Sequence, residues 1–229
     1  MHKQTRKPDW LRTSEAGSFA ESTIKQRKPE IIRRIVNENT FTPGVQARLD
    51  LFLAEITSID PPKPLNETAL DTLYWNKKLA ALQPNSWLDL PWYFAEAFFY
   101  RKVLEATDYF QSTKLGFLRD PFHSQKFHQM QVDLESFVRS EWLFDAAHHE
   151  RTLERLILAA LWGNRADLSH MDIDLSSPAL DLAGGAHLEM LINDLEQVQT
   201  FFSTQKSMIV YFADNVGREL FSDLALIDF

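Results

Sequence analysis

The sequence predicts a mainly α-helical protein, with an amino-terminal helical domain followed by the first strand and helix of an incomplete α/β (Rossmann-like) domain. Three observations support this prediction. Apolar residues recur at helical spacing, with short polar or proline-containing breaks, up to about residue 203. The segment 207–213 is apolar on both faces, as a buried parallel strand would be. It leads through the polar turn Asp214-Asn215-Val216-Gly217 into another helical pattern, and this order opens a parallel α/β unit.

Local patterns place the individual helices. The first is expected over 18–36, and Pro29 divides or kinks it because proline lacks an N–H and clashes with the preceding turn. The proline-rich connector 60–64 cannot be helical. The other expected helices are 45–56, a segment from Leu73 to Leu82, a very apolar helix from Pro91 to Leu104, 125–144, 145–162, a segment from Leu188 to Val198, and 218 to the end. We therefore divide the sequence into a flexible basic amino terminus (1–17), a helical domain (18–203) and the beginning of an α/β domain (204–229).

Composition excludes several classes of protein. The chain has 229 residues, 45% of them hydrophobic, so it can bury a sizeable core. No segment reaches the roughly 18 consecutive apolar residues of a membrane-spanning helix, and no apolar segment follows the basic start as in a signal peptide, so we expect a cytoplasmic protein without a membrane partner. The absence of cysteine excludes disulfides and thiolate metal sites. A net charge of -8 argues against nucleic acid as a partner. We interpret the basic run Lys25, Arg27, Lys28, Arg33 and Arg34 as a solvated helix face.

Two charged residues interrupt the most apolar predicted helix. Glu96 and Arg101 lie among phenylalanine, alanine and valine residues, where an ionised group is costly without a partner. Either they pair with other helices in a satisfied core network, or they belong to a functional site. The sequence leaves both interpretations open.

Asp214 and Asn215 are the candidate site residues with the clearest chemistry. In open parallel sheets, ligands bind beyond the carboxyl ends of the strands, and this pair follows the predicted strand directly. A carboxylate beside a carboxamide supplies the oxygen ligands that magnesium and manganese prefer. The helix that begins after Gly217 is expected to offer free N–H groups to a phosphate. The pattern therefore favours a metal and phosphate site at this turn, and the domain that begins here is predicted to bind metal.

Several segments resemble a known family. YFADNVGRELFSDL (211–224) resembles the metal-site motif of damage-control phosphatases, ALWGNRADLS (160–169) their second signature, and LINDLEQVQTFF the helix between the two. SFAESTIKQRKPEI and PWYFAEAFFYRKV are similar to the amino-terminal helices of subfamily III, the sugar phosphate phosphatases, which are also known as acidic-residue methyltransferase proteins. The resemblance runs in the same order from about Ser18 to Phe229.

The resemblance implies a metal-dependent phosphatase that acts on sugar phosphates such as fructose 1-phosphate, with manganese, magnesium, cobalt or nickel as the ion. It implies that Asp214 and Asn215 are metal ligands and that Asp214 is also the catalytic carboxylate. By the same resemblance, the substrate-binding residues are Asn164, Asp167, Glu96 and Arg101. We expect Asn164 and Asp167 to lie close to Asp214 in the folded protein.

The resemblance also bears on the extent of the chain. The family's third metal-binding aspartate would follow Phe229, so we expect these 229 residues to be an incomplete and inactive portion that does not bind a divalent ion tightly. Two alternatives to a phosphatase remain. One is a carboxyl methyltransferase that uses S-adenosylmethionine and a protein glutamate, and the other is a non-enzymatic helical interaction module. The oligomeric state is not readable from the sequence.

Overall fold

The computed structural model describes residues 10–138, 149–163, 192–204, 208–213 and 215–229. These residues are mainly helical, which confirms the predicted fold class at that level. The chain divides into two compact units, residues 1–124 and 125–229, and each is described by itself. No helix among the described residues is long and apolar enough to cross a membrane.

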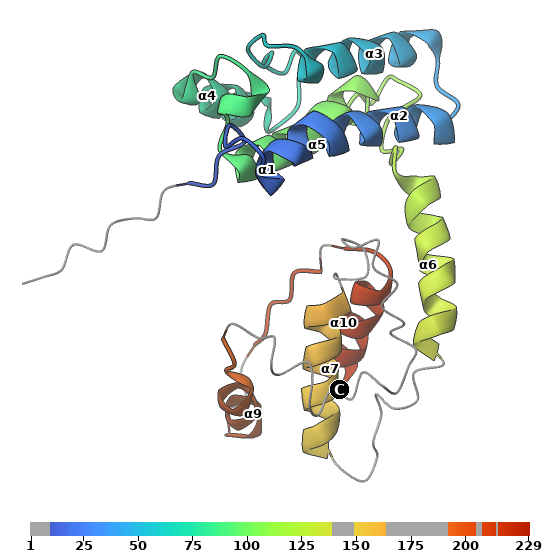
Figure 1. Cartoon of the computed structure of the whole chain (residues 1–229). Coiled ribbons are helices and arrows are strands. Elements are labelled where there is room, and N and C mark those ends of the chain that lie inside the picture. Colours follow the sequence, from blue (N-terminus) through green and yellow to red (C-terminus); the bar gives the residue numbers. More distant parts are fainter. Residues whose placement is uncertain (1–9, 139–148, 164–191, 205–207, 214) are drawn as a thin grey trace, which may run out of the picture. The chain divides into compact units, whose positions relative to one another are not determined.

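The first unit is an assembly of helices joined by short connections (Figure 1). Its elements are α1 (Phe19–Ser22), the π-helical turn η1 (Thr23–Arg27), α2 (Lys28–Glu38), α3 (Pro43–Thr57), α4 (Thr72–Leu82), the 3-10 turn η2 (Trp87–Asp89) and α5 (Trp92–Ala106). The chain stays helical from Phe19 to Glu38, and the predicted change at Pro29 takes the form of the wider turn η1 directly before α2. This turn ends where the Lys28 N–H donates to the Thr23 carbonyl, one residue before the proline that lacks an N–H.

Local signals account for the helix ends in this unit. The Thr42 side chain accepts a hydrogen bond from the Val45 N–H at the start of α3, and Pro43 follows at the first helical position. Helix α4 ends at Leu82 because Gln83 adopts a left-handed conformation, with φ of 46°, directly before Pro84. The helices from 45–56, 73–82 and 91–104 that the sequence predicts are therefore confirmed within a few residues.

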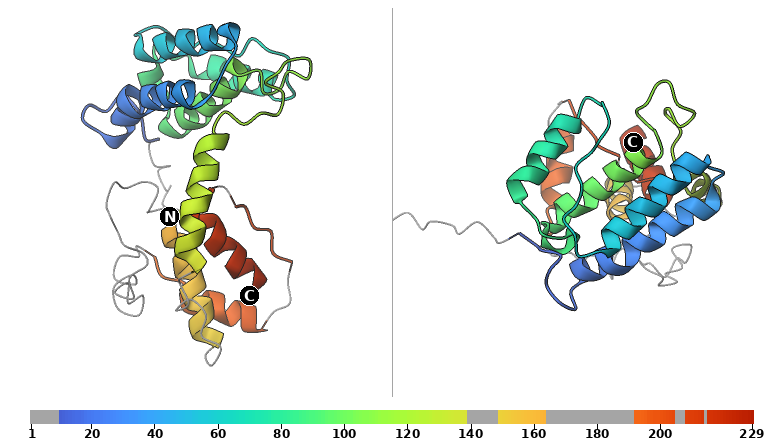
Figure 2. Two further views of the ribbon diagram at one scale, coloured as in Figure 1. Left: turned by 90° about the vertical axis from the view of Figure 1, so that its right-hand side faces the viewer. Right: turned by 90° about the horizontal axis from the view of Figure 1, so that it is seen from above.

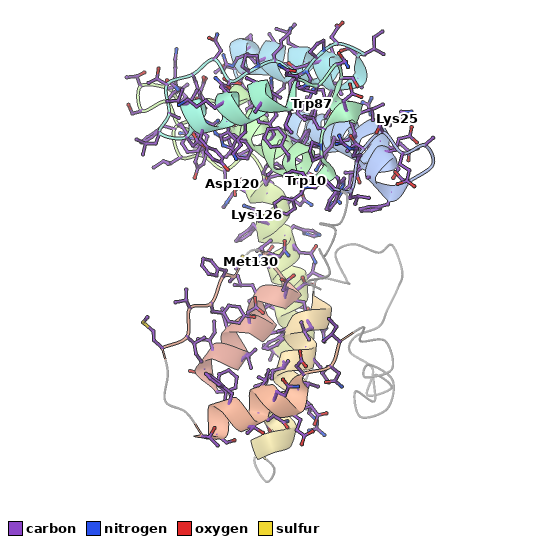
Figure 3. All side chains as sticks on the ribbon, turned by 90° about the vertical axis from the view of Figure 1, so that its left-hand side faces the viewer. Trp10, Lys25, Trp87, Asp120, Lys126 and Met130 are labelled. Carbon is purple, nitrogen blue, oxygen red and sulfur yellow. The ribbon has the colours of Figure 1, made fainter. Side chains whose placement is uncertain are left out.

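The core of the first unit is built around α5. Phe98, Phe99 and Val103 are fully buried on this helix, and Figures 1 and 2 show α2, α3 and α5 packed alongside one another. Trp87 stacks on Phe98 with ring centroids 5.7 Å apart. Figure 3 shows Trp87 within the body of this unit, whereas Lys25 lies at its edge. Other buried apolar residues of this core include Ile24, Ile32, Ile35, Leu49, Phe52, Ile56, Leu65, Leu79, Leu90 and Ala95.

The segment before α1 is attached to the same core. Thr13 is fully buried, and its hydroxyl donates to the Trp87 carbonyl at 3.0 Å. Arg12 forms an isolated antiparallel bridge with Pro91. These contacts fix the described residues that precede α1 against the start of α5.

The helices of the second unit are α6 (His123–Val138), α7 (His149–Gly163), α9 (Leu195–Thr204) and α10 (Arg218–Asp228). The first two residues of α6 belong to the first unit, which ends at Ser124. Helices α7 and α10 lie side by side (Figures 1 and 2). The predicted helix from residue 218 to the end is confirmed. The helix predicted from Leu188 to Val198 begins only at Leu195 among the described residues, because the Asn193 side chain accepts a hydrogen bond from the Leu195 N–H.

The predicted strand is not formed. Residues 208–213 are described, but they have no ladder partner, and the structure contains no β-strand in its described part. Most of their side chains face solvent, with Met208 90% and Phe212 87% exposed, whereas the Tyr211 hydroxyl donates to Oδ1 of Asp223 on α10 at 2.7 Å. A strand satisfies its backbone groups only through a neighbouring strand, and none lies beside this segment in the described residues.

Candidate functional site

The turn that leads into α10 carries Asn215, the one described residue of the predicted metal pair. Asn215 donates from its Nδ2 atom to Oε2 of Glu219, with the two atoms 2.9 Å apart. This hydrogen bond uses the nitrogen of the carboxamide and fixes the plane of the group. The carboxamide oxygen, which is the atom that a divalent ion takes, then lies on the other side.

Helix α10 is capped by a residue of another helix. Arg218, its first residue, donates its N–H to Oδ2 of Asp133 on α6 at 3.0 Å, and Gln129 donates from Nε2 to the same oxygen at 2.6 Å. The expectation that the first N–H groups of this helix are free for a phosphate is therefore wrong for Arg218. A carboxylate is stabilised at a helix N-terminus because the unbonded N–H groups carry partial positive charge.

Gly217 makes this cap possible. Its φ of 95° lies in the region that favours glycine, and a Cβ atom there would lie 2.5 Å from Asp133 Oδ2. The backbone conformation therefore favours glycine between Asn215 and α10, and a larger residue would also displace the Asp133 carboxylate.

A second glycine brings α7 against the same turn. A Cβ atom on Gly163, the last residue of α7, would lie 2.6 Å from the Cα atom of Glu219. The end of α7 therefore packs backbone to backbone on the first turn of α10. Asn164 follows Gly163 directly in the sequence, but Asn164, Asp167 and Asp214 lie outside the described residues, so their expected proximity stays a prediction.

Comparison with known proteins identifies the family to which this chain belongs. Residues 23–229 match the damage-control phosphatase ARMT1-like domain. The chain belongs to this damage-control phosphatase family.

Individual relatives agree with this assignment. The chain is similar to damage-control phosphatase ARMT1 of Macaca fascicularis, with 28% identity over 266 residues that cover 97% of this chain and 60% of the relative. The corresponding protein of Homo sapiens is 27% identical over 266 residues, with the same coverage, and that of Danio rerio is 26% identical over 264 residues, which cover 97% of this chain and 59% of the relative. The chain thus spans about 60% of the length of the curated relatives it matches.

In this member of the family, Glu96 is paired with a buried lysine. The Lys28 ammonium lies 2.5 Å from Glu96 Oε2 and between the rings of Phe99 and Tyr100, with its nitrogen 4.7 and 4.4 Å from their centroids. Burial lowers the pKa of Lys28 to about 8, although Glu96 opposes this shift. Lys28 is fully buried, so the interpretation of residues 25–34 as a solvated face is wrong for this residue.

The neighbouring position Arg101 is also paired inside the first unit. Its guanidinium contacts Glu67 at 2.5 Å and takes Asp71 in a two-point contact at 2.9 and 3.0 Å. Burial disfavours the charged form, but the hydrogen bonds with Asp71 and Glu67 outweigh burial and raise the pKa of Arg101. The same contact lowers the pKa of Asp71. The contacts therefore match the interpretation in which Glu96 and Arg101 pair with other segments of the core, and their substrate role stays a prediction.

Sequence reasoning missed Lys28 and Asp133. Lys28 had a recognisable signal, because it fills the gap in the apolar stripe between Ile24 and Ile31 and must point the same way as its neighbours. Asp133 had no local signal, since the N–H that it binds lies 85 residues away in the sequence. Within the described residues, no group of three or more histidine, aspartate or glutamate side chains is arranged to hold a metal ion.

Proposed function

We propose that this chain is part of a metal-dependent phosphatase that hydrolyses sugar phosphates, with fructose 1-phosphate as the representative substrate. The observation that carries the proposal is the fixed carboxamide of Asn215. Its nitrogen is held by Glu219 at the start of α10, in a chain that belongs to the damage-control phosphatase family. Side chains that bind a metal are usually oriented by a second residue, as Glu219 orients Asn215.

The residues that would hold the ion are Asp214 and Asn215. Their oxygen atoms fit manganese, magnesium, cobalt or nickel, and the absence of cysteine from the chain agrees with a site built on oxygen. When bound, such an ion neutralises the oxygens of a phosphate ester and helps to orient the attacking group. We assign Asp214 as the catalytic carboxylate as well as a ligand.

The loop after α7 would contribute the substrate contacts. Gly163 packs on Glu219, so the chain leaves α7 next to the turn that holds Asn215. This supports a position for Asn164, the next residue, at the phosphate, with Asp167 farther along the same loop. Glu96 and Arg101 already form ion pairs, with Lys28 and Glu67 respectively. A substrate that contacted either residue would bind beside this existing partner or replace it.

The exposed segment 208–213 supports the α/β part of the proposal. It is uncharged and apolar, and it exposes side chains that a soluble domain ordinarily buries. We propose that it forms a strand when another segment pairs with it, because its composition is that of a strand and its backbone has no ladder partner among the described residues.

Phosphate release by the complete protein, with fructose 1-phosphate and manganese, tests this function. Asp214→Ala should remove turnover because it removes the charged ligand, whereas Asn215→Ala should raise the manganese concentration needed for half-maximal activity about tenfold or more. Asp228→Ala is the matched control, since this exposed carboxylate lies at the far end of α10.

Turnover of the Asp214→Ala variant near that of the wild type would reject the metal assignment. If methyl transfer from S-adenosylmethionine to a protein glutamate occurs in place of phosphate release, the methyltransferase alternative holds. If neither reaction occurs, the interaction-module alternative remains.

A further inference from the structure

The N-cap residue of α10 supplies no side-chain cap. A helix usually begins with a side chain that accepts a hydrogen bond from one of its first N–H groups, but the residue at this position is Gly217, which has no side chain. The carboxylate of Asp133 supplies the missing acceptor from α6, at 3.0 Å from the Arg218 nitrogen.

The capping carboxylate is itself held in place. Gln129 lies one helical turn before Asp133 on α6 and donates to the same oxygen at 2.6 Å. Gly217 lies so close that a single added carbon would come within 2.5 Å of that oxygen. Asp133 is therefore fixed both by a hydrogen bond and by close packing against the turn.

The cap and the Asn215 contact hold one short segment at two points. Asn215 is tied forward to Glu219, and Arg218, which lies between them in the sequence, is tied to Asp133. The three residues from Asn215 to Gly217 lead into this anchored position. The Asn215 carboxamide can therefore rotate less, because Glu219 holds the side chain and the Asp133 cap holds the backbone that follows it.

We propose that Asp133 is a positioning residue for Asn215, the described ligand of the proposed metal site. It acts through the backbone of α10 and contacts neither metal nor substrate. The inference rests on the proposed function, because it gives Asp133 a role in orienting a residue that binds the metal ion of the proposed phosphatase.

The test measures manganese binding by calorimetry in the complete protein and, without metal, amide hydrogen exchange over residues 215–221. Asp133→Ala should weaken manganese binding about tenfold or more, as expected for a residue that orients a ligand, and should speed exchange at the start of α10. Asp133→Asn should restore most of both, because an asparagine oxygen accepts the same hydrogen bonds and asparagine caps helices as well as aspartate.

Two controls separate positioning from loss of stability. Glu135→Ala removes an exposed carboxylate from α6 and should change neither measurement. Leu156→Val shortens a fully buried side chain of α7 and should lower the melting temperature of the second unit without weakening manganese binding.

The outcomes distinguish a failure of the Asp133 inference from a failure of the proposed function. If the wild type binds manganese and Asp133→Ala binds it equally well, Asp133 does not position the turn. Equal weakening by Leu156→Val would also overturn the inference, because a general loss of stability would then explain the effect. If the wild type binds no manganese, the proposed function is wrong and the role in metal binding falls with it, and hydrogen exchange then decides whether Asp133 caps α10.

Discussion

The two units treat their apolar and charged side chains differently. The first unit buries Phe98, Phe99 and Trp87 completely and pairs the buried ammonium of Lys28 with a carboxylate. In the second unit, apolar side chains face solvent along residues 208–212 and on α6, where Phe127 is 54% exposed. The first unit encloses a core among its own helices, although it also exposes single apolar residues such as Ile59 and Leu70. The second carries the candidate site and exposes an unbroken run of apolar residues over 208–213.

The largest expected effect compares one phenylalanine from each unit. Phe98→Ala should lower the free energy of unfolding of the first unit by about 3–5 kcal/mol, because the lost ring leaves a cavity beside Trp75, Trp87 and Phe94. Phe212→Ala should change the stability of the second unit by no more than about 0.5 kcal/mol, because its ring is 87% exposed. Urea unfolding followed by hydrogen exchange in each unit measures both effects. A large loss for Phe212→Ala would show that residues 208–213 are packed in solution and would remove the contrast.

The second prediction tests the buried charge of the first unit. Lys28→Met should destabilise this unit by about 3 kcal/mol, since it leaves the Glu96 carboxylate without its partner and Glu96 Oε1 is already buried without a hydrogen bond. The double variant Lys28→Met with Glu96→Leu should regain most of the loss, because an apolar pair of similar volume replaces the ion pair. Urea midpoints of the wild type, the two single variants and the double variant measure the coupling. Equal losses in the single and double variants would mean that packing alone, without charge pairing, determines the effect.

The smallest expected effect is the pH dependence of the same ion pair. Burial lowers the pKa of Lys28 to about 8 from its ordinary value of 10.5, so between these values the unfolded chain binds more protons than the folded one. Stability from this group is therefore fully present above pH 10.5 and is lost as the pH falls through about 8. The first unit should gain about 1 kcal/mol between pH 7 and 9. The other charged or titratable groups around Lys28 are Glu96, Arg27 and Tyr100, and burial raises the pKa of Tyr100 above its ordinary value.

The double variant of Lys28 and Glu96 is the control for this measurement. It lacks the titrating pair, so its gain in stability between pH 7 and 9 should be smaller than that of the wild type by about 1 kcal/mol. Equal gains in the two proteins would contradict a lowered pKa for Lys28.

The sequence by itself determined the features that depend on neighbours along the chain. Helices α2 to α5 and α10 lie where apolar spacing places them, and Pro29 marks the division after η1 because a missing N–H acts within one turn. The family was also readable, since its motifs are continuous segments such as 160–169 and 211–224.

Tertiary structure decided the features that join distant segments. The sequence pattern shows Lys28 and Glu96 as charges in two helices, but only folding brings them together across 68 residues and makes their burial tolerable. Asp133 becomes a cap only because α6 reaches the start of α10, and no local pattern encodes a contact of that separation. The apolar segment 208–213 has the composition of a strand, yet a strand exists only where a neighbour accepts and donates its backbone hydrogen bonds.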